Sequence, residues 1–191
     1  MLRVMLIDDT QKDVSLLKEA LLAAGYEVVA EEHSPARLNE RVAEVQPDVI
    51  IIDTESPSRD VLEQVVVVSQ GAPRPIVMFT DDASSDAIQA SIRAGVTAYI
   101  VAGMQAERLK PILEVAQARF QADRELRDEL KLMQNRLADR KIIERAKGIL
   151  MQQKQVSEDE AHRLMRKLAM DRSLKLFEVA QKIIEASQFL S

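Results

Sequence analysis

The chain has 191 residues, of which 47% are hydrophobic and 30% charged, and its formal net charge is −5. This length suits one or two domains, and this composition is typical of a folded, soluble protein without a membrane-spanning segment. The absence of cysteine excludes disulfides, thiol chemistry and cysteine-based metal sites, and two histidines far apart in the sequence argue against a histidine metal site or a catalytic triad.

The chain begins with a short apolar run that ends in two acids. This run lacks the basic start and the longer apolar segment of a secretory signal peptide, so we expect a cytoplasmic protein. It is instead the first of several apolar runs that predict strands. The five predicted strands are residues 4–7, 26–30, 49–52, 76–79 and 98–101.

Segments with apolar residues at helical spacing separate these strands. They predict helices at residues 16–21, 38–45, 61–69 and 85–94. Residues 61–69 are rich in β-branched side chains and favour a strand by propensity alone, but the alternation of strands and helices favours a helix there. The first half therefore predicts an α/β fold with a doubly wound, five-stranded parallel sheet, in which ligands bind at the carboxyl ends of the strands.

Acidic and hydroxyl side chains stand at three of these strand ends. Asp8 and Asp9 follow the first strand, Asp53 the third and Thr80 the fourth. Clustered carboxylates repel each other unless a cation lies among them, and oxygen ligands suit Mg²⁺. A carboxylate beside Mg²⁺ can attack phosphorus, and Thr80 would then bind the new phosphate oxygen. The alternative is that acids end strands only because loops are polar.

Apolar residues recur at helical spacing in the segment that follows. They are Leu109, Ile112 and Ala116, and then Leu126, Leu130, Met133 and Leu137. The last four fit the a and d positions of a coiled coil. We therefore predict a homodimer in which two such helices pair in parallel, and the alternative is a helix that lies on its own domain.

The charge changes sign along the chain. Residues 1–104 hold 8 Lys and Arg against 17 Asp and Glu, whereas the remainder holds 18 against 14. The two halves are therefore expected to have different roles, and the basic half could bind a polyanion.

The most informative stretch of the basic half is residues 140–151, which predict a helix with an apolar stripe and a cationic face. Lys141, Arg145 and Gly148 share that cationic face. A glycine inside a helix costs roughly 1 kcal/mol relative to alanine, so a gain elsewhere is expected. Close approach of another backbone, flanked by cations, would supply that gain; the alternative is an exposed helix that tolerates one glycine.

Two further helices complete an all-α bundle. Ser157 and Glu160 form a predicted capping box at the start of one helix, and the last helix is expected to begin near Ser173. The inward stripes are Ala161, Leu164, Met165 and Leu168, and then Leu176, Val179, Ala180, Ile183 and Ile184. Three short helices alone do not distinguish RNA binding, DNA binding and protein docking.

The first half resembles the receiver domain of bacterial response regulators. The resemblance is carried by Asp8, Asp9, Asp53, Pro57, Thr80 and residues 95–99. It implies Asp53 as phospho-acceptor in a two-component phosphorelay, Asp8, Asp9 and Asp53 as Mg²⁺ ligands, and Thr80 with Tyr99 as the switch pair.

The chain departs from the receiver pattern close to the switch tyrosine. Receivers usually carry lysine and then proline where this chain has Ala102 and Gly103. That lysine pairs with the phosphoryl group, a charge-assisted contact that alanine does not supply. Asp81 also replaces the small residue usual after the switch threonine. We therefore expect control by a partner protein more than by phosphorylation.

The second half resembles the ANTAR output domain, which binds paired RNA hairpins through their loops and prevents transcription termination. The matching residues are Arg140, Ile143, Glu144, Ala146, Lys147, Gly148, Leu150, Met151, Ala161, Leu164, Arg166, Ala169, Met170, Val179 and Ala180. We predict a receiver at residues 1–120, a coiled-coil linker at 121–136 and a three-helix RNA-binding domain at 137–191. The expected RNA-binding residues are Arg140, Lys141, Arg145, Lys147, Gly148, Arg166, Lys167, Arg172 and Lys175.

Residues 53–60 and 73–80 are similar to NasT-type nitrate-assimilation antiterminators. The similarity implies a NasS-like nitrate or nitrite sensor protein that holds the regulator and releases it in response to these anions. The alternatives are a DNA-binding response regulator and a protein-interaction module without nucleic-acid binding. An enzyme is not expected, because the second half lacks a catalytic constellation.

Overall fold

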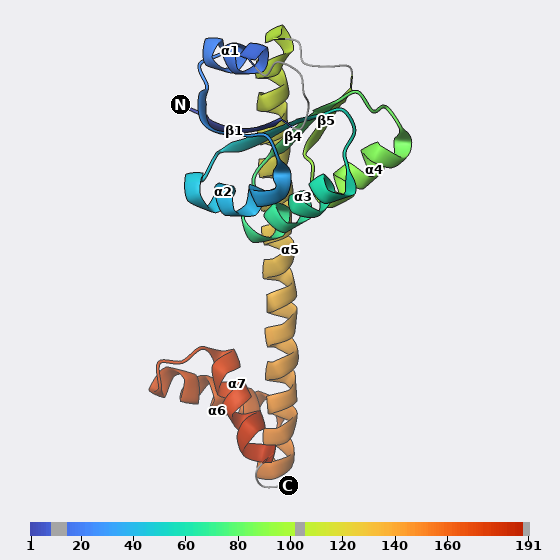
Figure 1. Ribbon diagram of the computed structural model, residues 1–191. Helices are drawn as coiled ribbons and strands as arrows, with labels where there is room; N and C mark the ends of the chain where they lie inside the picture. Colours follow the sequence, from blue (N-terminus) through green and yellow to red (C-terminus); the bar gives the residue numbers. More distant parts are fainter. Residues whose placement is uncertain (9–14, 102–105, 189–191) are drawn as a thin grey trace. The chain divides into compact units, whose positions relative to one another are not determined.

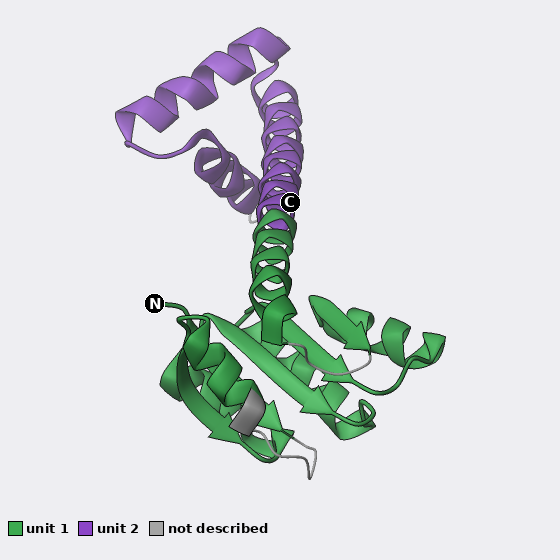
Figure 2. Ribbon diagram, turned by 90° about the horizontal axis from the view of Figure 1, so that it is seen from above, with its two compact units in different colours: residues 1–124 green, residues 125–191 purple. Residues whose placement is uncertain are grey.

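The computed structural model describes residues 1–8, 15–101 and 106–188, with the side chains of residues 15 and 16 left out. Asp9, Ala102 and Gly103 therefore lie outside the described residues. The chain forms two compact units, residues 1–124 and 125–191, which we describe separately (Figure 2). The boundary falls inside a long helix, and the three-part division of the sequence stays a prediction.

Unit 1 contains a five-stranded parallel sheet, as the sequence predicts (Figure 1). The strands are β1 (Arg3–Asp8), β2 (Glu27–Glu32), β3 (Val49–Thr54), β4 (Ile76–Thr80) and β5 (Ala98–Val101), in the order β2-β1-β3-β4-β5. The central strand β3 is apolar from Val49 to Ile52, and these four side chains are completely buried. Such continuous apolar runs form where helices cover both faces of a parallel sheet.

Helices cover both faces of this sheet. They are α1 (Ser15–Ala23), η1 (Pro35–Arg37), α2 (Leu38–Val45), α3 (Arg59–Gly71), α4 (Ser85–Ala94) and α5 (Ala106–Lys154). Helices α1 and the first turns of α5 pack on one face, while α2, α3 and α4 pack on the other (Figure 1). The doubly wound architecture predicted from the sequence is therefore confirmed.

Helix α3 shows why the alternation of elements outweighs strand propensity. Its buried residues Val61, Val65 and Val68 recur at intervals of four and three, which place them on one face of a helix. Ser58 caps the helix, since its hydroxyl accepts a hydrogen bond from the Val61 amide at 3.3 Å. The predicted helix is confirmed because tertiary packing of one valine stripe outweighs the weak propensity of each residue.

Unit 2 contains α5 from Glu125 to Lys154, then α6 (Glu158–Asp171) and α7 (Leu176–Gln188). The capping box is confirmed: the Glu160 amide donates to the Ser157 hydroxyl at 3.3 Å, and the Ser157 amide donates to the Glu160 carboxylate at 3.1 Å. Helix α7 begins at Leu176 rather than near Ser173, because Ser173 has a φ of 52° and lies in a turn. The Leu174 amide closes that turn on the Ala169 carbonyl at 2.9 Å.

Small and apolar residues join the three helices of unit 2. Ala146 of α5, Ala161 of α6 and Ala180 of α7 are completely buried, and Leu150 and Met165 complete the cluster. Alanine at each contact lets the helix backbones approach closely.

Among the described residues, no helix combines the length and the apolar character that a membrane span requires.

Candidate functional site

The carboxyl edge of the sheet brings two of the predicted acids side by side. Asp8 of β1 and Asp53 of β3 are direct partners in the parallel register. Asp8 is only 3% exposed and Asp53 is half-buried, and both side chains interact with neighbours. The register therefore places two carboxylates at the end of adjacent strands, where doubly wound sheets bind their ligands.

These two carboxylates have the donor chemistry that suits Mg²⁺, which prefers a few oxygen ligands and retains several waters. Within residues 1–8, 15–101 and 106–188, no group of three His, Cys, Asp or Glu side chains is arranged to hold a metal ion. The third predicted ligand, Asp9, lies outside this part of the chain. Two of the three expected Mg²⁺ ligands, Asp8 and Asp53, are thus among the described residues.

Thr80 lies at the end of β4, directly opposite Thr54 of β3. Its hydroxyl donates a hydrogen bond to the Glu55 carbonyl at 2.9 Å and accepts one from the Asp82 amide at 3.2 Å. The Asp81 amide also donates to the Glu55 carbonyl, at 3.2 Å. Thr80 is 2% exposed, so its hydroxyl is held by the backbone of the two loops that follow β3 and β4.

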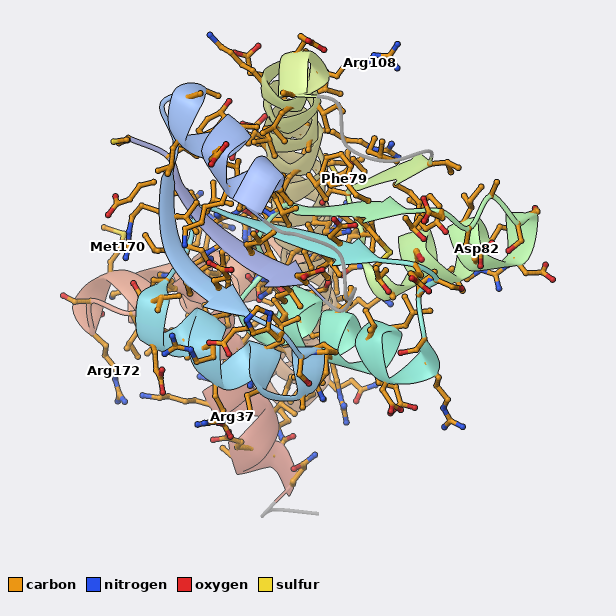
Figure 3. The ribbon with its side chains drawn as sticks, turned by 45° about the horizontal axis from the view of Figure 1, so that its top comes forward. Arg37, Phe79, Asp82, Arg108, Met170 and Arg172 are labelled. Atoms are coloured by element: carbon orange, nitrogen blue, oxygen red, sulfur yellow. The ribbon has the colours of Figure 1, made fainter. Side chains whose placement is uncertain are left out.

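Tyr99 of β5 reaches the loop that follows β4. Its hydroxyl donates to the Asp82 carbonyl at 2.8 Å, and burial raises the pKa of this phenol. The Asp82 carboxylate accepts hydrogen bonds from the Ser84 amide at 2.8 Å and from the Ser56 hydroxyl at 2.7 Å. The bond from the Ser84 amide contributes most, and together with the bond from Ser56 it lowers the pKa of Asp82. The ionised carboxylate can therefore accept both hydrogen bonds. Asp82 lies in the loop before α4 (Figure 3).

The hydroxyls of the predicted switch pair are therefore both bonded to backbone carbonyls. Thr80 is bonded to Glu55 and Tyr99 to Asp82. A phosphoryl group on Asp53 would have to draw the Thr80 hydroxyl away from the Glu55 carbonyl before it gained that contact. Asp82 joins Tyr99 to the loops that follow β3 and β4, and the sequence does not indicate this because the bonded residues are far apart along the chain.

Unit 2 carries the predicted nucleic-acid interface. Most of the cations assigned to it from the sequence are exposed, namely Arg140, Lys141, Arg145, Arg166, Lys167, Arg172 and Lys175. Within the described part of unit 2, none of these seven side chains forms an ion pair with a carboxylate. Four of them lie in the second half of α6 or in the turn after it, and Figure 3 shows Arg172 at the end of that helix.

Gly148 lies on the exposed side of α5, as the sequence analysis expects. A Cβ atom built at this position meets no atom within 4 Å. Packing inside unit 2 therefore does not require glycine here. The open surface at Gly148, with Lys141 and Arg145 exposed on the same helix, is available to another molecule.

Lys147 requires a correction to the sequence-based assignment. Its side chain is only 11% exposed, and its ammonium lies 2.8 Å from the Glu144 carboxylate and 2.7 Å from that of Glu158. Glu144 belongs to the same helix, whereas Glu158 is the first residue of α6. Lys147 therefore links α5 to α6 and does not lie on the cationic surface. Hydrogen bonds to Glu144 and Glu158 raise the Lys147 pKa, and the bond from Lys147 lowers that of Glu158.

One exposed cation near the end of α6 was missing from the site predicted from the sequence. It is Lys182 of α7, which lines a groove together with Arg172. Leu168, which the sequence analysis places inward, is 37% exposed. The charge of Lys182 and its place on the polar side of α7 were visible in the sequence, but its proximity to the end of α6 depends on the turn between the helices.

The predicted coiled-coil seam is exposed along α5. Leu126, Leu130, Met133 and Leu137 are 66%, 56%, 49% and 61% exposed. Four exposed apolar residues at alternating steps of four and three form a stripe that a second helix would cover.

Comparison with known families agrees with both halves of the chain. Residues 4–114 match the family described as "Response regulator receiver domain", and residues 131–184 match the "ANTAR domain". The chain is 31% identical over 183 residues to "Transcriptional regulatory protein PdtaR" of Mycobacterium tuberculosis, covering 96% of this chain and 89% of that protein.

A second relative covers less of the chain. The chain is 29% identical over 75 residues to "Nitrate regulatory protein" of Klebsiella oxytoca, covering 39% of this chain and 19% of that protein.

Among solved structures, the receiver domain of NarL from Mycobacterium tuberculosis aligns with a TM-score of 0.54 and 21% identity, covering 61% of this chain and 96% of that one. The CheY-like receiver from Methanospirillum hungatei aligns with a TM-score of 0.56 and 19% identity, covering 64% and 98%. These structural likenesses show the fold of unit 1.

The link formed by Lys147 predicts a selective effect on unit 2. Lys147→Glu brings three carboxylates together where one ammonium holds two, so we expect a lower urea midpoint for unit 2 only. Both tyrosines, Tyr26 and Tyr99, lie in unit 1 and the chain has no tryptophan, so tyrosine fluorescence follows unit 1 alone. Circular dichroism at 222 nm should show the early loss of helix while the fluorescence transition stays in place.

Lys141→Glu is the matched control, because Lys141 is exposed on the same helix without an ion pair in the described residues. The ion pair between Lys147 and Glu158 should stabilise unit 2 fully at pH values between the ordinary pKa of glutamate, 4.5, and that of lysine, 10.5. Its contribution is lost as the pH falls through the lowered Glu158 pKa or rises through the raised Lys147 pKa. Equal urea midpoints for the two charge reversals would contradict the assignment.

Proposed function

Because the chain belongs to the response regulators that join a receiver domain to an ANTAR domain, we propose that it is a transcription antiterminator that binds paired hairpins in leader RNA. The observation that carries this proposal is the open surface at Gly148, beside the exposed cations Lys141 and Arg145. RNA hairpins present phosphates and unstacked loop bases, and a helix surface without a side chain lets such a backbone come close. Bound hairpins would then compete with formation of the terminator.

The distribution of charge in unit 2 favours a polyanion as the ligand. Helix α6 has three acids in its first turn, whereas Arg166 and Lys167 lie in its second half and Arg172 and Lys175 follow it. Cations without carboxylate partners lose little when they bind phosphates, because no existing ion pair has to break. We therefore assign phosphate contacts to these four residues and to Arg140, Lys141 and Arg145, and a structural role to Lys147.

The input to this output domain is proposed to come mainly from a partner protein. Asp53 is the proposed phospho-acceptor, and Asp8 and Asp53 would hold Mg²⁺ together with Asp9; the ion would supply charge neutralisation for phosphoryl transfer. The bond from Thr80 to the Glu55 carbonyl, and Ala102 in place of the usual lysine, weigh against a strong response to phosphorylation. A sensor that binds the receiver would bypass both obstacles.

Nitrate or nitrite assimilation is the proposed context, with a NasS-like sensor as the partner. The similarity of residues 53–60 and 73–80 to NasT-type regulators supports it, and so does the shorter match to a protein named "Nitrate regulatory protein". We place this regulation in the cytoplasm, where leader RNA is transcribed. The protein would act through binding, and any chemistry at Asp53 would be regulatory.

The function can be tested by crosslinking the full-length protein to RNA in its own cells, grown with and without nitrate. Sequencing of the crosslinked RNA should recover leaders with paired hairpins upstream of nitrate-assimilation genes, and mass spectrometry should recover a NasS-like nitrate sensor only from cells without nitrate. Recovery of duplex DNA in place of RNA would favour a DNA-binding response regulator. Recovery of protein alone would favour an interaction module.

Gly148→Ala provides a sharp prediction, because stability and RNA binding should change in opposite directions. Alanine favours the helix by roughly 1 kcal/mol over glycine, and a Cβ meets no atom of the protein within 4 Å, so unit 2 should become more stable. The same methyl group would occupy the space proposed for the RNA backbone. We expect at least about tenfold weaker binding of the captured hairpin RNA in a gel shift, the effect of losing one close backbone contact.

Gly71→Ala is the matched control, since Gly71 ends α3 in unit 1 and its added Cβ meets only Asn39 Oδ1 at 3.9 Å. It should leave the RNA affinity unchanged. If Gly148→Ala binds RNA as tightly as the wild type, the proposed contact between the RNA backbone and Gly148 is refuted.

The homodimer is proposed to form through the exposed stripe of α5. Leu130→Asp places a charge in the seam and should convert a dimer to a monomer in sedimentation equilibrium. Leu132→Asp is the control, because Leu132 is 51% exposed on the same helix but lies outside the seam. A wild-type protein that sediments as a monomer at micromolar concentration would refute this part of the proposal.

A further inference from the structure

A groove between α6 and α7 is not explained by the packing of unit 2. It has a volume of about 190 Å³ and is lined by Leu168, Arg172, Leu174, Val179, Lys182, Ile183 and Ala186. Five of these seven residues are aliphatic, and the two others are cations. The groove is smaller than the roughly 300–1,000 Å³ of sites that enclose a drug-sized ligand, so it suits one flat group rather than a whole nucleoside.

The two cations of the groove are available for a ligand. Arg172 and Lys182 are exposed, and neither forms an ion pair with a described carboxylate, although Asp171 and Glu185 are close to them in the sequence. An apolar floor with cations beside it complements a group that is flat, uncharged and attached to phosphates. An unstacked base in an RNA loop has this chemistry.

The turn that joins the two helices fixes the mouth of the groove. Ser173 adopts a φ of 52°, and its amide donates to the Met170 carbonyl at 3.2 Å. At the start of α7, the Lys175 amide donates to the Glu178 carboxylate at 2.7 Å. Arg172 and Leu174 flank Ser173, so two residues of the lining are positioned before any ligand binds. Such preorganisation lowers the entropy lost on binding.

We propose that this groove binds one unstacked base of the hairpin loop, with Arg172 and Lys182 on the adjacent phosphates. The inference rests on the proposed RNA-binding function and extends it from phosphate contacts to a base. The described part of unit 2 has two side chains with aromatic rings, Phe177 and His162, and both are half-buried and absent from the groove lining. An aliphatic slot therefore takes the place of the aromatic stacking that RNA-binding proteins often use.

The proposal can be tested by filling the groove without changing its charge. Ala186 is exposed on α7, so Ala186→Leu retains the helix and places a larger side chain in the slot. The probe is the captured leader hairpin, synthesised with each loop nucleotide in turn made abasic. At one loop position the wild type should lose about fivefold to tenfold in affinity, as expected for removal of one buried base. Ala186→Leu should bind the intact RNA with a similar loss and should show no further loss with that abasic RNA.

Ala118→Leu is the matched control, because Ala118 is also an exposed helical alanine but belongs to unit 1 and does not line the groove. It should bind intact and abasic RNA as the wild type does. Arg172→Gln combined with Lys182→Gln should reduce the slope of log K against log salt by about 1.4, for two single-strand phosphates.

The outcomes separate this inference from the function on which it rests. If Ala186→Leu binds intact RNA as tightly as the wild type, or if no abasic position weakens wild-type binding, the groove does not take a base although RNA binding stands. If Ala186→Leu instead changes sedimentation of the RNA-free protein, the groove is a contact between copies of the chain and the inference is overturned. If the wild type binds no hairpin, both proposals fail.

Discussion

Three alanines, one from each helix, set the distance at which α5, α6 and α7 pack in unit 2. Ala146, Ala161 and Ala180 are completely buried, and a larger side chain at any of them would force the helices apart. With the helices this close, Glu158 at the start of α6 reaches Lys147 of α5 at 2.7 Å. The ammonium is thus held between two carboxylates, while Lys141, Arg145 and Gly148 stay on the open side of α5. The proposed interface depends on this division of the helix into a packed side and an open side.

The two units use charge in different ways. In unit 1 the carboxylates Asp8 and Asp53 meet at the end of adjacent strands, and the hydroxyls of Thr80 and Tyr99 are held by backbone carbonyls. In unit 2 most exposed cations lack carboxylate partners among the described residues. If unit 2 binds RNA as proposed, the acidic unit 1 would disfavour association with RNA and the cationic surface of unit 2 would favour it, because net charge steers encounters between macromolecules.

The sequence predicts the fold well because its signals are periodic. Short apolar runs gave all five strands, and the valine stripe of α3 followed from the alternation of elements even though propensity favoured a strand. The start of the last helix was wrong because the backbone at Ser173 turns into a left-handed conformation, which nothing in its residue type requires. Such a turn is set by packing on both sides of it.

The candidate site was predicted less completely, since its details depend on contacts between distant residues. Lys147 directly precedes Gly148, which lies on the cationic face, so its charge made it a candidate. Only the three-dimensional packing brings Glu158 to Lys147. Lys182 was missed because its proximity to Arg172 requires the turn between α6 and α7. Thr80 was identified by residue type, whereas its bond to the Glu55 carbonyl follows from loop geometry. Residue type and spacing therefore find candidates, and packing decides which of them face a ligand.

The central claim is that unit 2 keeps leader hairpins folded and so prevents termination. The most direct measurement is single-round transcription in vitro of the captured leader with its own terminator, with and without the full-length protein. We predict that the protein raises the fraction of full-length transcript, and that replacing the hairpin loops in the template abolishes the increase. Unchanged termination at protein concentrations that saturate the hairpins would contradict the claim.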